Sequence, residues 1–120
     1  MKLIYSTVVS GIGKMAEAFY EEKLIILFQD NAPDELADYC VLHAGNAVSD
    51  AIRMGDVLVI GGEEYEITYV GDVVQENLKQ LGHITLRFDG KTEGLEGSLC
   101  LEEKELPVIC IGDSISIYRN

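Results

Sequence analysis

The most constraining feature of this sequence is that apolar residues recur at every second position within short segments. Residues 65–70, 83–88 and 114–118 all alternate in this way. A period of two predicts strands that bury one face and expose the other. Residues 24–28 and 57–60 are short continuous apolar runs, which predict fully buried strands. The sequence therefore favours a fold built mainly from short strands.

Three further segments, residues 3–9, 39–43 and 98–102, complete the predicted strands, and glycines and acidic residues separate the segments. Many short strands at near-regular spacing indicate a closed barrel or a sandwich. No linker or low-complexity segment divides the 120 residues. Because this length suits one core, we expect a single mostly β domain over residues 1–120.

Three short helices are expected between the strands. The first is one or two turns within residues 14–22, and the second begins at Pro33 and ends near Tyr39. The third occupies residues 72–81, where Asp72 to Gln75 has the form of a capping box and Gly82 suits a helix C-terminus.

Charge and cysteine content limit the classes of function. The chain has 21 acidic and 9 basic residues, a net charge of −12, which disfavours nucleic acids and anionic membranes and favours basic partners. Cys40, Cys100 and Cys110 include no CxxC pair, which argues against disulfides and thiolate metal clusters and fits a reducing compartment. Cys100 and Cys110 have apolar surroundings, so we expect them in the core. No run approaches the roughly 20 apolar residues of a spanning helix, so a cytoplasmic protein that does not cross the membrane is expected.

The two histidines are the candidates for chemistry. His43 ends a predicted strand and precedes a small turn, so we expect an exposed imidazole, with backbone N–H groups near Gly45 free to approach an anion. His83 begins a strand, and Thr85 and Arg87 share its polar face. A hydroxyl and a guanidinium there could hold a phosphoryl oxygen or fix an imidazole tautomer.

Other interpretations of these residues remain open. Histidines at strand ends are more often surface or core-edge residues than nucleophiles. Cys40 precedes His43 by three residues, so alternation points the two side chains apart and disfavours a Cys–His pair. A zinc site formed by His43, His83 and a carboxylate lacks any supporting HxH or HExxH spacing. We therefore expect no bound metal and no cofactor.

Two longer segments resemble a known family. Residues 77–90, NLKQLGHITLRFDG, and residues 32–43, APDELADYCVLH, are similar to the landmark stretches of the glucitol/sorbitol-specific IIA proteins of the bacterial phosphotransferase system. The resemblance covers essentially the whole chain. It implies a closed β-barrel with a few short helices, often paired as a homodimer.

The resemblance also implies a function. Such proteins accept a phosphoryl group from the phosphocarrier HPr on a histidine, here His43. They pass it to a cysteine of the cognate IIB domain, and the membrane IIC unit imports the sugar alcohol as its phosphate. The alternatives are a non-catalytic regulatory barrel and a metal-binding barrel, neither of which needs a nucleophilic histidine.

The sequence departs from this family at one position. Relatives carry a second histidine just after the nucleophile and before a glycine, whereas Ala44 and Gly45 follow His43 here. We hypothesise that His83, held near His43 together with Thr85, takes the supporting role. Catalytic residues are thus expected at His43 and His83, with Thr85, Arg87 and Gly45 as groups that stabilise the phosphoryl oxygens.

Overall fold

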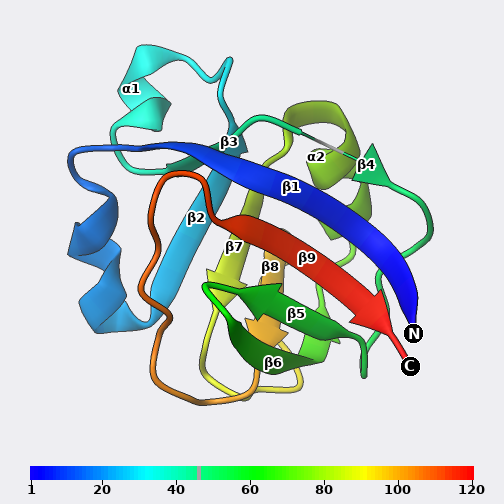
Figure 1. The fold of residues 1–120 in the computed structure, drawn as a ribbon. Helices are drawn as coiled ribbons and strands as arrows, with labels where there is room; N and C mark the ends of the chain where they lie inside the picture. Colours follow the sequence, from blue (N-terminus) through cyan, green and yellow to red (C-terminus); the bar gives the residue numbers. More distant parts are fainter. Residues whose placement is uncertain (46) are drawn as a thin grey trace.

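The structure is a computed structural model that describes residues 1–45 and 47–120 (Figure 1). Its strands are β1 (Lys2–Ile12), β2 (Leu24–Gln29), β3 (Val41–His43), β4 (Ala47–Val48), β5 (Val57–Ile60), β6 (Glu63–Val70), β7 (Ile84–Arg87), β8 (Ser98–Leu101) and β9 (Ser114–Arg119). The helical elements are the 3₁₀ helix η1 (Ala16–Glu22) and the α-helices α1 (Asp34–Ala37) and α2 (Val74–Leu81).

The described strands form one sheet in the order β3-β2-β7-β8-β6-β5-β9-β1-β4, and β3 also pairs with β1. This last pairing closes the first eight strands of that order into a barrel and leaves β4 as an extra strand on β1. The pairs β2–β3 and β7–β8 are parallel, while the other pairs are antiparallel. The predicted closed β-barrel with a few short helices is confirmed.

Side-chain alternation fills the barrel as the sequence pattern predicts. In β7, Ile84 and Leu86 are buried while Thr85 and Arg87 are half-buried, so the apolar face points inward. The largest fully buried side chains come from most of the strands and include Tyr5, Ile25, Leu27, Leu58, Tyr65, Ile67, Leu78, Leu86, Phe88 and Leu99. Their burial supplies the main driving force for folding.

The expected capping box of the third helix is wrong. Helix α2 begins after Val73, which makes no side-chain cap hydrogen bond. Gln75 instead uses its amide across the fold, because its Oε1 accepts from the Ile52 amide at 3.1 Å and its Nε2 donates to the Ile52 carbonyl at 2.7 Å. This bidentate contact fastens α2 to the loop before β5. At the other end Gly82 has φ +64° in the left-handed region, as expected for a helix C-terminus.

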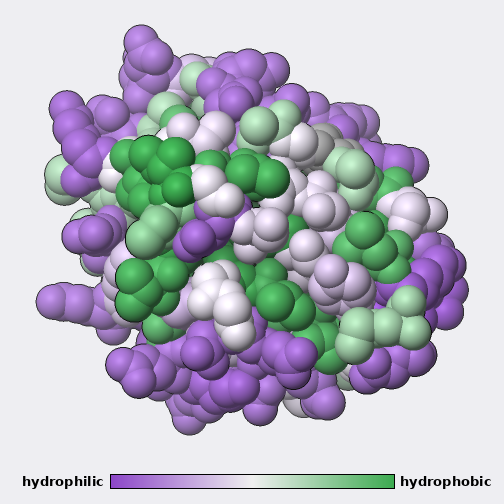
Figure 2. Space-filling view, viewed as in Figure 1, coloured by the Kyte–Doolittle hydropathy of each residue, from purple (hydrophilic) through white to green (hydrophobic). Residues whose placement is uncertain are grey.

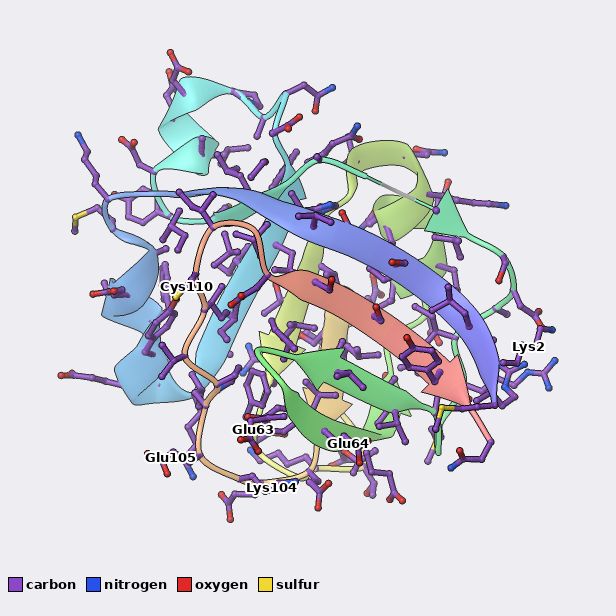
Figure 3. The ribbon with its side chains drawn as sticks, viewed as in Figure 1. Lys2, Glu63, Glu64, Lys104, Glu105 and Cys110 are labelled. Carbon is purple, nitrogen blue, oxygen red and sulfur yellow. The ribbon has the colours of Figure 1, made fainter. Side chains whose placement is uncertain are left out.

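One end of the barrel is rich in acidic side chains. Figure 3 shows Glu63, Glu64 and Glu105 around Lys104 at the bottom of the view, on the far side from β3. Lys104 Nζ donates to the Glu64 carbonyl at 2.6 Å and lies 5.2 Å from the centre of the Tyr65 ring.

The predicted burial of Cys110 is wrong. Cys110 is exposed, since it lies in the loop between β8 and β9, whereas Cys100 is buried in β8 as expected. Other apolar residues of that loop are also exposed, as are some apolar residues of β1. Figure 2 shows apolar side chains on the face that carries β1, β9 and β5. The exposed large apolar residues of β1 are Leu3 and Val8, and those of the loop between β8 and β9 are Val108 and Ile111.

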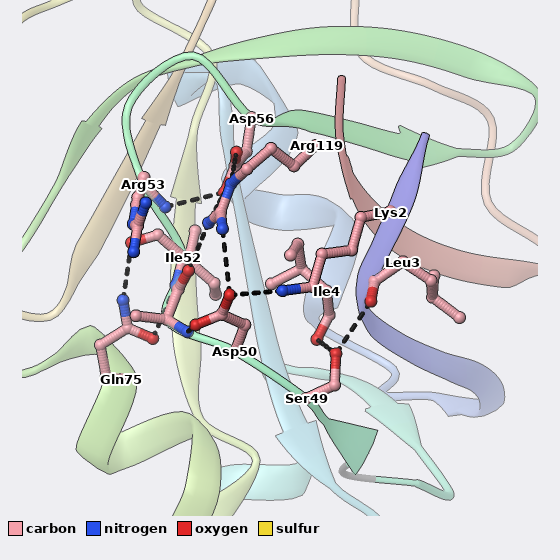
Figure 4. A network of polar contacts seen from close by, with 11 residues as sticks. Lys2, Leu3, Ile4, Ser49, Asp50, Ile52, Arg53, Asp56, Gln75 and Arg119 are labelled. Atoms are coloured by element: carbon pink, nitrogen blue, oxygen red, sulfur yellow. Dashed lines mark hydrogen bonds and ion pairs between the residues drawn. The ribbon is translucent and has the colours of Figure 1, made fainter.

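A network of charged groups joins both ends of the chain to the loop before β5 (Figure 4). Asp56 is buried and accepts from the Arg53 amide at 2.8 Å, from Arg119 Nε at 2.9 Å and from Arg119 Nη2 at 3.0 Å. Arg119 Nη1 donates to Asp50 at 3.1 Å, and Lys2 Nζ donates to the same Asp50 oxygen at 2.7 Å. The hydrogen bond from Lys2 is the largest of the causes that lower the pKa of Asp50. The start of β1 and the end of β9 are thereby tied to one loop.

We expect the Asp56→Asn variant to lose about 1–3 kcal/mol of unfolding free energy, because a buried acceptor of charged hydrogen bonds is replaced by a neutral amide. Lys2→Ala removes the exposed end of the same network and is expected to cost little or nothing. Urea denaturation followed by circular dichroism measures both. Equal midpoints for the two variants would contradict the structural importance of the buried carboxylate.

Candidate functional site

The topology brings three chain segments together at one edge of the barrel. Strands β2 and β3 run parallel with Gln29 beside His43, so both strands end at the same edge. Strand β7 runs antiparallel to β2 with Ile84 beside Leu27, so the turn that enters β7 lies at that edge too. On its other side β3 pairs with β1, with Val9 beside His43. His43 therefore lies on the β1–β3 seam that closes the barrel.

The expectation of an exposed imidazole at His43 is wrong, because His43 is fully buried, with 0% exposure. Val41 and His43 both point into the barrel, as alternation along β3 requires. The chain after His43 does not leave the barrel but stays against β1, where the Ala44 amide donates to the Val8 carbonyl at 3.0 Å. The residue directly after His43 is therefore held against β1.

Both nitrogens of the His43 ring have close polar partners. Nδ1 lies 2.7 Å from the Gly45 carbonyl oxygen and 2.9 Å from Thr7 Oγ1. Nε2 lies 2.7 Å from the Gly82 carbonyl oxygen. A carbonyl can only accept, so a ring nitrogen bonded to one must carry a proton, whereas a hydroxyl can either donate or accept. The Gly45 and Gly82 carbonyls therefore each require a protonated ring nitrogen, whereas the Thr7 hydroxyl can pair with Nδ1 in either protonation state.

Gly45 contributes to the site in a different way from the one expected. Its amide donates to Thr7 Oγ1 at 2.9 Å, and its carbonyl receives the Thr7 hydroxyl at 3.0 Å as well as Nδ1. In this arrangement the Gly45 N–H is committed within the protein and does not point at a free anion site. Gly45 acts here as a backbone clamp for the imidazole.

Gly82 has a second reason to be glycine besides its positive φ. A Cβ built on Gly82 would lie 2.8 Å from His43 Cε1, 2.9 Å from His43 Nε2 and 2.9 Å from Gln29 Cβ. Real Cβ atoms do not make such contacts. Only a residue without a side chain lets the helix end approach the ring closely enough for its carbonyl to bond Nε2.

The second histidine lies on the other face of the barrel wall. The His83 ring stacks on Phe28 with ring centres 4.9 Å apart, and burial lowers the pKa of His83. Within residues 1–45 and 47–120, neither histidine ring hydrogen-bonds to the other. The two landmark segments do meet, but they do so through the carbonyl of Gly82, the residue before His83.

The structure does not bring Thr85 and Arg87 to the His43 ring. Both belong to the outer face of β7, and Arg87 Nε donates to Ser98 Oγ at 3.0 Å. At 3.3 Å per residue, Arg87 lies roughly 16 Å along the chain from Gly82. The nearest polar side chain to Nδ1 among the described residues is instead that of Thr7, which the sequence interpretation missed. Its position on β1, two residues from buried Tyr5 and Val9, was the available signal.

Metal-binding and thiol chemistry find little support in the described residues. In the part of the chain that the structure describes, no three histidine, cysteine, aspartate or glutamate side chains are placed to hold a metal ion. Burial raises the pKa of the Cys40 thiol to about 11, which keeps it protonated and poorly nucleophilic.

None of the described helices is long and apolar enough to cross a membrane.

The fold and site thus define a closed β-barrel in which a buried histidine is gripped at both ring nitrogens. Comparison with known proteins identifies the family of this barrel. Residues 4–116 match the family model described as PTS system glucitol/sorbitol-specific IIA component. The chain belongs to that family.

Individual relatives agree with this assignment. The PTS system glucitol/sorbitol-specific EIIA components of Escherichia coli (strain K12) and Shigella flexneri are each 38% identical over 93 residues, which is 78% of this chain and 76% of theirs. The crystal structure of a PTS system IIA component from Enterococcus faecalis V583 is similar, with a TM-score of 0.83 and 35% identity. The match covers 95% of this chain and 99% of that one.

We expect Gly82→Ala to lower the unfolding free energy by about 1–3 kcal/mol more than Gly90→Ala does. Gly90 has nearly the same φ, +66°, but a Cβ there would lie no closer than 3.4 Å to Glu103. Both variants therefore carry similar backbone strain, and only Gly82→Ala also collides with the imidazole. Urea denaturation gives the difference, and the NMR signals of the His43 ring should shift in Gly82→Ala alone. Equal losses and an unshifted ring would contradict the close approach.

Proposed function

We propose that this protein is a cytoplasmic phosphocarrier that accepts a phosphoryl group from phospho-HPr on His43 and passes it to the cysteine of its IIB partner. The observation that carries the proposal is the placement of His43, a buried imidazole oriented at both nitrogens by Thr7, Gly45 and Gly82. Membership of the glucitol/sorbitol-specific IIA family supports the choice of donor and acceptor.

The contacts favour Nε2 as the nitrogen that takes the phosphoryl group. Nδ1 is held by two groups, Thr7 of β1 and Gly45 in the turn after β3, while Nε2 is held by one carbonyl at the end of α2. Freeing Nδ1 would break contacts with two separate segments, β1 and the turn after β3. Freeing Nε2 requires only that the turn containing Gly82 move away.

This arrangement has a consequence for the carrier cycle. Because the ring is fully buried and Nε2 faces the Gly82 carbonyl, the described state is a closed resting state. Displacement of the turn would expose Nε2, which then releases to water the proton that it donated to the Gly82 carbonyl. Its freed electron pair forms the new N–P bond, while Nδ1 keeps its proton. The donor's bond to phosphorus breaks, and its electron pair stays with the donor. Nδ1 keeps its contacts with Thr7 and Gly45 throughout, so the ring keeps its orientation.

The partners follow from the same proposal. HPr and the IIB domain would approach the barrel edge where the Gly82 carbonyl meets the ring, and the membrane IIC unit would carry the sugar alcohol, which this chain does not touch. A homodimer is a further proposal, and the exposed apolar residues Leu3, Val8, Val108 and Ile111 offer a surface suited to a protein partner.

Incubation with Enzyme I, HPr and phosphoenolpyruvate should add one acid-labile phosphoryl group to the wild type and none to His43→Gln. Intact mass before and after acid treatment measures the gain, and a circular dichroism spectrum shows that the variant is folded. A gain in both proteins would move the acceptor elsewhere. No gain in either would favour a non-catalytic regulatory barrel.

The same assay tests the proposed support from His83. Since its ring contacts Phe28 and not His43, any assistance must act through the turn that holds Gly82. His83→Ala should slow phosphoryl transfer if the stack positions that turn, and His83→Phe, which keeps a ring against Phe28, should restore the rate. Unchanged rates in His83→Ala would exclude the supporting role.

The net charge of −12 gives an expectation for association with HPr. We expect the association rate constant to fall several-fold between low salt and about 0.15 M, because salt screens attraction between an acidic chain and a basic docking surface. Stopped-flow mixing over a salt series measures it. A rate constant independent of salt would show that steering by charge plays no part.

A further inference from the structure

The carrier cycle described above uses Thr7 only to orient the ring and gives its hydroxyl proton no role. Thr7 is buried, with 4% exposure, and its Oγ1 lies within 3.0 Å of three polar atoms. The Gly45 amide donates to it, which uses one acceptor position. Its single proton then has two acceptors in reach, the Gly45 carbonyl at 3.0 Å and Nδ1 of His43 at 2.9 Å.

The two partners of Nδ1 serve different protonation states. When Nδ1 carries a proton, it donates to the Gly45 carbonyl at 2.7 Å. When Nδ1 has lost its proton, that carbonyl offers only a lone pair against another lone pair. Among the described residues, the Thr7 hydroxyl is then the group in contact with Nδ1 that can donate to it.

Phosphoryl transfer makes this difference matter. After Nε2 forms its bond to phosphorus, the ring is a cation with its proton on Nδ1. Loss of that proton gives a neutral ring, which releases the phosphoryl group less readily because the leaving nitrogen would depart as an anion. A hydrogen bond from a hydroxyl to the unprotonated Nδ1 stabilises this longer-lived form.

We propose that Thr7 is a positioning residue whose hydroxyl donates to Nδ1 once that nitrogen loses its proton, and that it thereby sets how long a phosphoryl group stays on His43. The idea rests on the proposed function, since it requires a phosphorylated His43. The hydroxyl contacts the ring and not the phosphoryl group, because Nδ1 and Nε2 are at separate positions of the imidazole.

The test compares Thr7→Val, which keeps the shape of the side chain and removes the hydroxyl, with Thr7→Ser, which keeps the hydroxyl. The phosphorylated proteins are separated from Enzyme I and HPr, and loss of the phosphoryl group near neutral pH is followed by intact mass. We expect Thr7→Val to shorten the lifetime about 3- to 10-fold, the effect of one lost hydrogen bond, and Thr7→Ser to remain near the wild type.

A second readout does not depend on phosphoryl transfer. The ¹⁵N NMR signal of Nδ1 in the unphosphorylated protein reports whether that nitrogen carries a proton, and only His43 and His83 contribute such signals. At a fixed, mildly alkaline pH, the share of unprotonated Nδ1 at His43 should fall in Thr7→Val and recover in Thr7→Ser. Thr68→Val, which removes a hydroxyl bonded to the Lys91 carbonyl, should change neither readout.

Three results would overturn the proposal. They are an unchanged lifetime and Nδ1 signal in Thr7→Val, equal changes in Thr7→Val and Thr7→Ser, and the same changes in Thr68→Val. If Thr7→Val does not fold, Thr7→Ala and Thr7→Ser form a second pair that differs only in the hydroxyl. If the wild type takes no phosphoryl group from HPr, the proposed function fails, while the Nδ1 signal still decides the role of Thr7.

Discussion

The β1–β3 pairing is the constraint on which the rest of the structure depends. It turns an open sheet into a barrel, and it does so with the residue that carries the candidate chemistry, because Val9 of β1 lies beside His43 of β3. Strand β1 also provides Thr7, which contacts the ring, and the turn after β3 provides Gly45. The pairing that closes the barrel therefore also brings the imidazole and its Nδ1 partners together.

The two nitrogens of the His43 ring are held by different parts of the fold. Nδ1 contacts Thr7 of β1 and Gly45 after β3, whereas Nε2 contacts the Gly82 carbonyl at the end of α2. The seam is held by backbone ladders on both sides of β3, whereas the Gly82 carbonyl sits at the end of a helix of eight residues. A buried polar ring with all its partners is costly to disturb, because each lost partner leaves an unsatisfied group. A movement that frees the ring would consequently break the fewest contacts on the Gly82 side.

Much of the fold follows from local pattern, and much of the site does not. Alternation in residues 83–88 places Ile84 and Leu86 inside and Thr85 outside, as observed. Exposure of His43 could not be judged from the small residues that follow it, because their contact with β1 depends on pairing between distant strands. The capping box failed for a similar reason, since Gln75 found a better partner at Ile52, far along the chain. Long-range pairing also hid Thr7, which is 36 residues from the ring it contacts.

The position of Leu81 gives the Gly82 contact a wider meaning. Leu81 ends α2 and is 45% exposed, while the next residue bonds a ring that solvent does not reach. A partner that binds the end of α2 more tightly when Gly82 has moved would shift the ring towards its available state without entering the barrel. By thermodynamic reciprocity, a phosphoryl group on Nε2 would in turn strengthen the binding of that partner. Under the proposed function, binding at the exposed last turn of α2 and access to the buried His43 would thus be thermodynamically coupled.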